Sequence, residues 1–514
     1  MSDLILPSRR DLLLGASVLA GSALLPAWGG RLLAQPRFAS HPFTLGVASG
    51  EPEPNGMVLW TRLAPAPFEE RGGMGEDAVP VGWEVSEDGG FTRIVQSGTV
   101  WAMPHAAHSV HVEVGGLRPD RQYFYRFHAG HETSSIGRTR TTPLPGDDVA
   151  SLRYAFTACQ HYETGYYGAY RHLVEDDPAL ILFLGDYIYE RPGLPDRPRR
   201  HLDEPAADLA SYRRRFAQYK GDANLQAAHA AAPWMVMWDD HEVANNYNAE
   251  VSQSGRDAAA FLVRRAAAYQ AYYEHMPLRR RSLPVGPDMQ LYRSLAWGRL
   301  VRFQLLDGRQ YRDDMACREP APAGKTVADC AARQDPARSM LGMPQERWLM
   351  RDLAGSDARW NVVAQQFMMA EARRPDPVTG EISFALDGWD GYAAARDRLL
   401  AFLRDAKIAN PVAIGGDSHA FIASHLAIGD GPTIMPAFVG GSLSSTSGPD
   451  FSKMVEASPQ IRFSENRQRG YSIVDVTPQA TVLKMRAAAD ATNPLTATTT
   501  LRRFEMEAGR PGFA

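Results

Sequence analysis

The chain has 514 residues, of which 44% are hydrophobic and 22% are charged. This usage is ordinary for globular proteins, so it excludes a disordered, collagen-like or coiled-coil chain. The length allows about three domains, or one large domain and a smaller one. The net charge of −4, without a long basic run, argues against a nucleic-acid-binding surface. Three cysteines are too few for a disulfide scaffold, and their odd number leaves at least one thiol to explain.

The N-terminus has the pattern of an export signal. The pair Arg9-Arg10 precedes a mildly apolar run over residues 12–25 that is too short to span a bilayer. The paired arginines resemble the twin-arginine signal, which is read by a translocase that carries folded proteins. We therefore expect a signal peptide over residues 1–34, with Ala27 as an alternative cleavage point. The mature protein is then periplasmic or secreted and has no transmembrane helix.

Residues 40–143 contain short apolar runs that alternate with polar positions and are separated by turn signals. The clearest of these runs lie at residues 57–62, 82–86, 108–114 and 122–127. Runs of this kind and spacing predict a small all-β sandwich. Residues 116–123 resemble the tyrosine corner of fibronectin type III-like domains, so we expect a fibronectin- or Ig-like sandwich here.

After residue 150, apolar strand-like segments alternate with segments of helical period. The expected strands lie at residues 153–158, 180–184, 234–238, 300–306, 361–365 and 411–414. The expected helices lie at residues 167–175, 209–220, 257–275, 344–353 and 391–406. Closing strands are expected within residues 470–486 and 498–507. This alternation predicts a layered α/β domain over residues 150–508, with its ligands at the carboxyl ends of the strands.

Five clusters of polar or reactive residues come directly after predicted strands. They are Cys159-Gln160, Asp186 with Tyr189 to Arg191, Asp239 to Asn246, Gln365-Gln366, and Asp417 to His419. Each cluster alone is ordinary, since a lone cysteine is usually a buried apolar residue and an aspartate after a strand usually belongs to a turn. Together, and in this order, they predict one shared site.

The order and spacing of these clusters resemble the metallophosphoesterase superfamily, and the strings GDYIYE and WDDHEVANN resemble PhoD-type alkaline phosphatases. The resemblance covers nearly the whole chain and includes residues 307–312, 389–392 and 416–419. Gly308 departs from the family, where threonine is common. The resemblance implies a metallophosphoesterase-like catalytic domain of β-sheets between helices, and an enzyme that uses Fe(3+) and Ca(2+).

The resemblance also implies a set of metal ligands. The ferric ion favours anionic donors, and its ligands would be Cys159, Asp186, Tyr189 and His419. Asp186 would bridge to the second metal. Calcium takes oxygen ligands, which Asp240, Asn246 and Asp417 would supply. Either Asn245 or Asn246 could be the ligand, and we prefer Asn246.

Further residues would bind phosphate or orient the ligands. Arg191 and His241 would be the catalytic phosphate contacts, together with Asn246, and His241 is alternatively a proton donor. Asp239, Glu242 and Asn245 would orient the ligands, and Gln365 or Gln366 would add an amide oxygen. Because the nucleophile would be a metal-activated water or oxide in line with the leaving group, no protein nucleophile is needed.

Three hypotheses about the function follow from these predictions. The first is an exported phosphatase that acts on phosphate monoesters, diesters or both. The second is a phospholipase D-like phosphodiesterase on the same fold, acting on phospholipid headgroups. The third is a non-catalytic extracellular protein that binds calcium. Elemental analysis separates the third reading from the others, because it predicts calcium without iron.

The cysteine count gives one more prediction. Cys317 and Cys330 lie in a loop-like stretch rich in proline and alanine, where they can pair and contribute about 3 kcal/mol of stability. A free thiol is a liability after export. We therefore expect one disulfide, with Cys159 held on a metal.

Overall fold

The computed structural model describes residues 36–514, except 203–204, 254–256, 318–325, 329 and 448–449. The predicted signal peptide therefore lies outside the described residues. Residues 37–514 form a single compact unit, which is the part described below. In this described part, no helix combines the length and the apolar character needed to cross a membrane.

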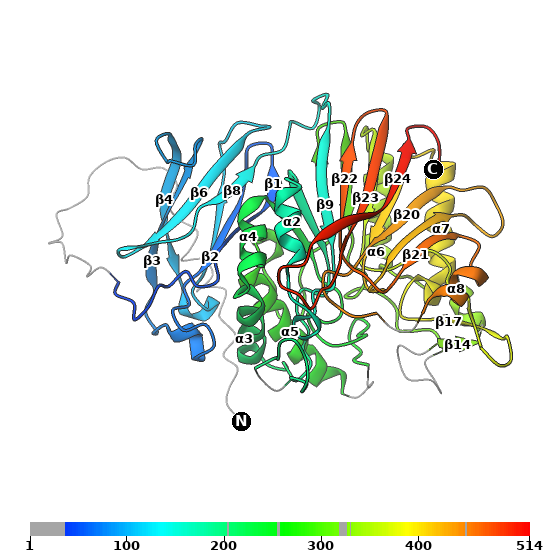
Figure 1. The fold of residues 1–514 in the computed structure, drawn as a ribbon, viewed down its shortest axis with the longest axis horizontal. Coiled ribbons are helices and arrows are strands. Elements are labelled where there is room, and N and C mark those ends of the chain that lie inside the picture. The colour runs from blue at the N-terminus through cyan, green and yellow to red at the C-terminus, as the bar shows by residue number, and fades with distance from the viewer. Residues whose placement is uncertain (1–35, 203–204, 254–256, 318–325, 329, 448–449) are drawn as a thin grey trace. The chain divides into compact units, whose positions relative to one another are not determined.

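The N-terminal region is all-β, as predicted (Figure 1). Its strands are β1 (Val47–Glu53), β2 (Gly56–Arg62), β3 (Val79–Ser86), β4 (Ile94–Ala102), β5 (Ser109–Val114), β6 (Gln122–Ala129), β7 (Glu132–Thr133) and β8 (Gly137–Arg140). One sheet has the order β4-β3-β6-β7, with β8 also paired to β6, and apolar side chains pack between it and β1, β2 and β5. The Tyr123 hydroxyl accepts a hydrogen bond from the Arg118 N–H at 3.0 Å, as expected for a tyrosine corner.

A nine-stranded sheet joins this region to the rest of the chain. Its order is β24-β23-β22-β9-β10-β11-β1-β2-β5. The new strands are β9 (Leu152–Thr157), β10 (Leu180–Leu184), β11 (Trp234–Met237), β22 (Arg469–Val476), β23 (Ala480–Ala488) and β24 (Thr498–Glu507). Strand β1 pairs in parallel with β11 at Gly50 and Trp234. Only glycine fits at position 50, because a Cβ would lie 2.7 Å from the Trp234 carbonyl oxygen.

A seven-stranded sheet packs against the nine-stranded one. Its strands, in order, are β12 (Arg293–Trp297), β13 (Val301–Leu305), β15 (Trp360–Ala364), β18 (Pro411–Gly415), β20 (Met435–Gly440), β19 (Phe421–Leu426) and β21 (Ile461–Glu465). Side chains from both sheets, such as Phe156 and Phe303, form one buried core. The central strands read as continuous apolar runs because both of their faces are covered.

Helices cover the outer faces of both sheets. Against the nine-stranded sheet lie α2 (Ala169–Glu175), α3 (Leu209–Lys220), α4 (Ala223–Ala231) and α5 (Ala258–His275). Against the seven-stranded sheet lie α6 (Met343–Ala354) and α7 (Ala393–Asp405). A short helix, α8 (Ser452–Ala457), and a small sheet of β14 (Thr326–Ala328), β17 (Ile382–Ala385) and β16 (Arg374–Pro375) complete the unit (Figure 1). The predicted layered α/β architecture is confirmed.

Candidate metal centre

The predicted clusters meet where the parallel strands of both sheets end. Cys159, Asp186 and Asp240 follow β9, β10 and β11, while Asp417 follows β18 in the other sheet. Within the predicted clusters, three groups of ligand atoms each lie within 4.8 Å of one another. They are Cys159, Asp186 and His419; Asp186, Asp240 and His241; and Asp239, Asp240 and Asp417. The groups overlap at Asp186 and Asp240, so the site is one continuous cluster.

Strained turns present these side chains to the cluster. The φ angle is 56° at Cys159, 59° at Asp186, 52° at Asn246, 59° at Asp417 and 50° at His419. This left-handed conformation costs about 1–3 kcal/mol for a residue with a Cβ and gathers at functional sites. Five residues in this backbone conformation around one cluster indicate that the strained turns serve to position side chains for binding.

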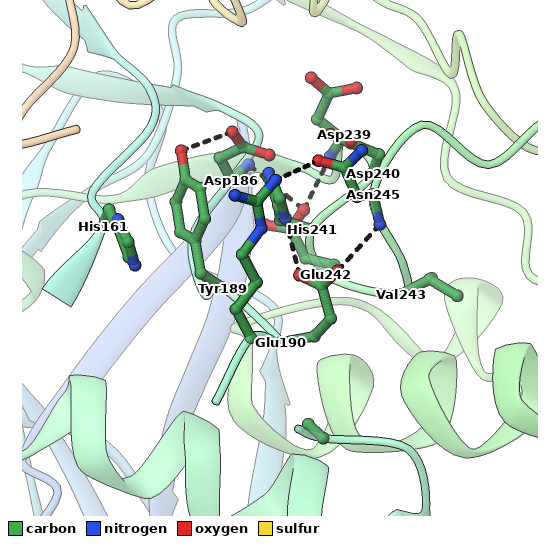
Figure 2. A network of polar contacts seen from close by, with 12 residues as sticks. His161, Asp186, Tyr189, Glu190, Asp239, Asp240, His241, Glu242, Val243 and Asn245 are labelled. Carbon is green, nitrogen blue, oxygen red and sulfur yellow. Dashed lines mark hydrogen bonds and ion pairs between the residues drawn. The ribbon is translucent and has the colours of Figure 1, made fainter. Parts of the chain in front are cut away.

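Tyr189 lies at the centre of the first group. Its hydroxyl donates to Asp186 Oδ2 at 2.7 Å and lies 3.0 Å from His419 Nε2. Its ring is stacked between His161 and His241, with centroid distances of 4.3 and 4.1 Å, and Figure 2 shows the two imidazoles on opposite sides. Burial and the Asp186 carboxylate raise the pKa of Tyr189 well above its usual value. A nearby cation would reverse this and favour the phenolate.

The cluster holds more negative charge than its own side chains neutralise. Burial, which outweighs the opposing effect of Arg309, raises the pKa of Asp417 to about 8. Burial, followed by the Asp186 carboxylate, raises the pKa of Glu242 to about 8. Among the described residues, buried Asp186 Oδ1 and Asp239 Oδ2 have no hydrogen-bond partner. Unpaired buried carboxylate oxygens are costly, so this donor set fits bound cations.

Burial and the carboxylates of Asp186 and Asp417 likewise raise the pKa of the Cys159 thiol well above its usual value. Cys159 is free and buried, while Cys317 and Cys330 form a disulfide. The disulfide expected from the sequence is therefore present, and the one free thiol lies beside the carboxylates.

Arg309 is a site residue to which the sequence pattern assigned no role. Its guanidinium is fully buried, and it donates to Asp239 Oδ1 at 2.5 Å and to Asp387 Oδ2 at 2.9 Å. Its Nη2 lies 3.4 Å from Asp240 Oδ1 and 3.8 Å from Asp417 Oδ1. One arginine thus faces four aspartates. The only sequence signal for it was its place in the family-like segment 307–312.

Two glutamates organise the turns (Figure 2). Glu242 accepts hydrogen bonds from the backbone N–H groups of Asp186, Tyr187 and Asp239 at 3.2, 2.5 and 2.8 Å, which fits its predicted orienting role. Glu190, to which the sequence pattern assigned no role, accepts from His241 Nδ1 at 2.7 Å and from the Asn245 N–H at 2.9 Å. Glu190 therefore fixes the orientation of the His241 ring.

Arg191 lies on the rim of the cluster. Its guanidinium donates to Asn245 Oδ1 at 2.5 Å, in contact with solvent. The Asn245 side chain bonds to Arg191 and Gln253, and the Asn246 backbone N–H donates to Asp240 Oδ2 at 2.6 Å.

Gln365 and Gln366 form hydrogen bonds with the backbone around the strand ends. Gln365 Oε1 accepts from the Trp389 indole N–H at 3.0 Å and from the Phe367 N–H at 2.8 Å. The Gln366 amide donates to the Trp238 and Leu306 carbonyls at 2.8 and 2.9 Å. Neither amide contacts a predicted metal ligand through these bonds, so both glutamines support the strand ends.

Comparisons with known proteins agree with this geometry. The family model described as PhoD-like phosphatase matches residues 154–485, and that of the PhoD-like phosphatase N-terminal domain matches residues 30–143. Alkaline phosphatase D of Bacillus subtilis is 43% identical over 532 aligned residues, which cover 98% of this chain and 88% of that protein. Purple acid phosphatase 23 of Arabidopsis thaliana is 27% identical over 152 residues, 26% of this chain and 30% of that protein. A solved structure titled "Structure of PhoD" superposes with a TM-score of 0.88 at 44% identity and covers 93% of each chain.

Proposed function

Because the chain belongs to the PhoD-like phosphatase family and is a phosphatase, we propose that it is an exported, metal-dependent hydrolase of phosphate esters. The observation that carries the proposal is the continuous cluster of overlapping ligand groups, in which buried carboxylate oxygens lack partners. The arginine pair near the N-terminus supports export to the periplasm or secretion. We assign residues 1–34 to the signal peptide, 40–143 to the β-sandwich and 150–508 to the catalytic domain.

The cluster suits two kinds of metal. Cys159, Asp186, Tyr189 and His419 offer one thiolate, one carboxylate, one phenolate and one imidazole, a set that fits Fe(3+). Asp240, Asn246 and Asp417, with Asp186 between, offer oxygen donors that fit Ca(2+). When bound, such ions supply positive charge to the phosphate oxygens and acidify water.

The protein's own groups bind and orient the ester. Arg191, whose guanidinium is exposed and hydrogen-bonded to Asn245, would bind the equatorial phosphate oxygens. His241 donates through Nδ1 to Glu190, so its Nε2 is the atom free to face the substrate. Burial lowers the pKa of His241, but Asp240, Glu190 and Asp186 outweigh burial and raise it to about 10. A protonated imidazole here would bind a phosphate oxygen or give a proton to the leaving oxygen.

The substrate class includes monoesters and diesters, and a phosphodiesterase acting on phospholipid headgroups is the alternative on the same site. The test is turnover of p-nitrophenyl phosphate and of bis(p-nitrophenyl) phosphate by the purified protein, before and after treatment with a chelator. We expect monoester turnover that the chelator abolishes. A preference for the bis-ester would support the phosphodiesterase instead.

A matched pair of variants tests the metal ligands in the same assay. Asp417→Asn removes a proposed calcium ligand, while Asp430→Asn removes an exposed carboxylate in a loop. We expect the first variant to lose at least about a hundredfold in kcat/KM and the second to keep the wild-type value. Turnover that resists both chelation and Asp417→Asn would contradict the proposal.

A further inference from the structure

The loop after strand β20 lies beside the metal cluster, although the sequence pattern did not single it out. Strand β20 pairs in parallel with β18, after which Asp417 follows, so the residues after β20 reach the same edge of the sheet. Gly441 has a φ of 90°, and a Cβ there would collide with the Phe421 ring, so the turn away from β20 requires glycine. Residues 442–446, here called the serine loop, come next. Its three serines, Ser442, Ser444 and Ser445, are buried.

The serine loop holds the turn that carries Cys159. The Cys159 carbonyl oxygen accepts hydrogen bonds from the Ser442 hydroxyl at 2.8 Å, the Ser445 hydroxyl at 2.7 Å and the Ser445 backbone N–H at 3.1 Å. The Ser444 hydroxyl donates to the His161 carbonyl at 2.9 Å, and the His161 backbone N–H donates to Ser445 Oγ at 3.0 Å. The left-handed turn at Cys159 is therefore fixed by a segment far away in the sequence.

The same loop orients the ring of His419. His419 Nδ1 lies 2.8 Å from the Thr446 carbonyl oxygen, which can only accept a hydrogen bond, so Nδ1 carries a proton. In the neutral ring the lone pair is then on Nε2, which lies 3.0 Å from the Tyr189 hydroxyl and 3.8 Å from Asp186 Oδ2. A histidine that binds metal through one nitrogen usually donates the other N–H to a carbonyl or carboxylate. The serine loop therefore holds His419 with Nε2 directed at the cluster.

Ser445 also contacts the Tyr189 oxygen directly, at 2.7 Å. The Tyr189 hydroxyl donates to Asp186 Oδ2 (Figure 2), but as a metal ligand the Tyr189 oxygen has no proton and can only accept. The Ser445 hydroxyl can then turn to it, because the Cys159 carbonyl keeps two other donors, the Ser442 hydroxyl and the Ser445 backbone N–H. A hydrogen bond to an ionised oxygen is about twice as strong as one between neutral groups.

We propose that Ser445 is a positioning residue of the metal centre, whose hydroxyl donates a hydrogen bond to the Tyr189 oxygen and holds it toward the iron. The inference rests on the proposed function, because it takes Cys159, Tyr189 and His419 as ligands of Fe(3+). One loop thus supports three ligands that come from separate parts of the chain. The hydrogen bond stabilises the electrons of the phenolate oxygen, so it tunes the metal as well as the position of its ligand.

The visible absorption and the iron affinity of Ser445→Ala test this proposal. Without the hydrogen bond, an electron leaves the phenolate oxygen at a lower cost, so the phenolate-to-iron absorption should move to longer wavelength. Resonance Raman spectra identify the part of the absorption that comes from the phenolate. Competition with a chelator should show an iron affinity lowered by about tenfold to a hundredfold. The matched control is Ser444→Ala, which removes a buried hydroxyl of the same loop that donates to the His161 carbonyl, and it should keep the wild-type wavelength. Ser445→Thr, which keeps a hydroxyl, should also absorb as the wild type does.

The outcomes separate this inference from the proposed function. If the wild type contains iron and its phenolate absorption is unchanged in Ser445→Ala, the inference is overturned and the proposed function stands. An equal shift in Ser445→Ala and Ser444→Ala would also overturn the inference, because the effect would then come from a general loosening of the loop. Loss of iron from Ser445→Ala but not from Ser444→Ala would support it. A wild type that binds no iron would contradict the proposed metal centre and the inference together.

Discussion

Glu190 should set the alkaline limit of the activity, and Glu190→Gln tests this. The substitution keeps a hydrogen-bond acceptor for His241 Nδ1, at 2.7 Å in the wild type, and removes one negative charge. Three carboxylates, those of Asp240, Glu190 and Asp186, raise the pKa of His241 to about 10 against the effect of burial. When Asp186 and Asp240 bind metal, Glu190 remains as the carboxylate directed at His241.

The size of the expected pKa shift follows from the contact between Glu190 and His241. An opposite charge at this range shifts a pKa by about 1–3 units, and each unit corresponds to about 1.4 kcal/mol. The protonated imidazole is the active form, so activity is lost as the pH rises through the pKa of His241. Removing the Glu190 charge lowers that pKa, and the alkaline limb should move down by about 1–3 pH units.

The assay is the pH profile of kcat/KM for a chromogenic monoester between about pH 6 and 11. The iron and calcium contents of each preparation are measured alongside. Glu190→Asp, which restores the charge, should recover part of the wild-type profile. The reasoning is refuted if Glu190→Gln, at unchanged metal content, keeps the wild-type alkaline limb.

Three further outcomes are expected. Arg309→Gln leaves buried carboxylates without their cation, so metal-free protein should lose about 3–5 kcal/mol of unfolding free energy in denaturant titration, while exposed Arg467→Gln should lose almost none. Cys317→Ser with Cys330→Ser should lower stability by about 3 kcal/mol by freeing the loop that the disulfide closes, and an unchanged unfolding midpoint would count against this. Cys159→Ser should lose iron and the visible charge-transfer absorption of the wild type, and a variant with full iron content and activity would show that Cys159 is no ligand.

Local sequence signals, such as helix caps and the spacing of apolar residues, predicted many of the helices and strands. Helix α3 occupies the predicted range 209–220 because Asp208 forms a capping box with Ser211 and the apolar positions repeat with helical period. Helix α4 was not predicted, because its alanine-rich sequence has no strong apolar stripe, although Asp222 caps it. The pairing of β1 with β11 was also beyond prediction, since nothing in the sequence relates Gly50 to Trp234.

The site residues, too, could be predicted only in part. Residues directly after strands, such as Asp186 and Asp417, could be predicted because parallel strands deliver their carboxyl ends to one edge. Arg309 could not, because its importance comes from aspartates that are distant in sequence. Gln365 follows a strand as the ligands do, yet it bonds to Trp389 and the Phe367 backbone. Position after a strand therefore indicates the right edge of the sheet, but not which side chains face the site.

The metal content of the purified, active protein tests the central claim most directly. Elemental analysis should find one iron per chain together with calcium, and chelation should remove calcium and phosphatase activity together, with both restored when calcium is returned. Full phosphatase activity in a protein that contains neither iron nor calcium would contradict the account.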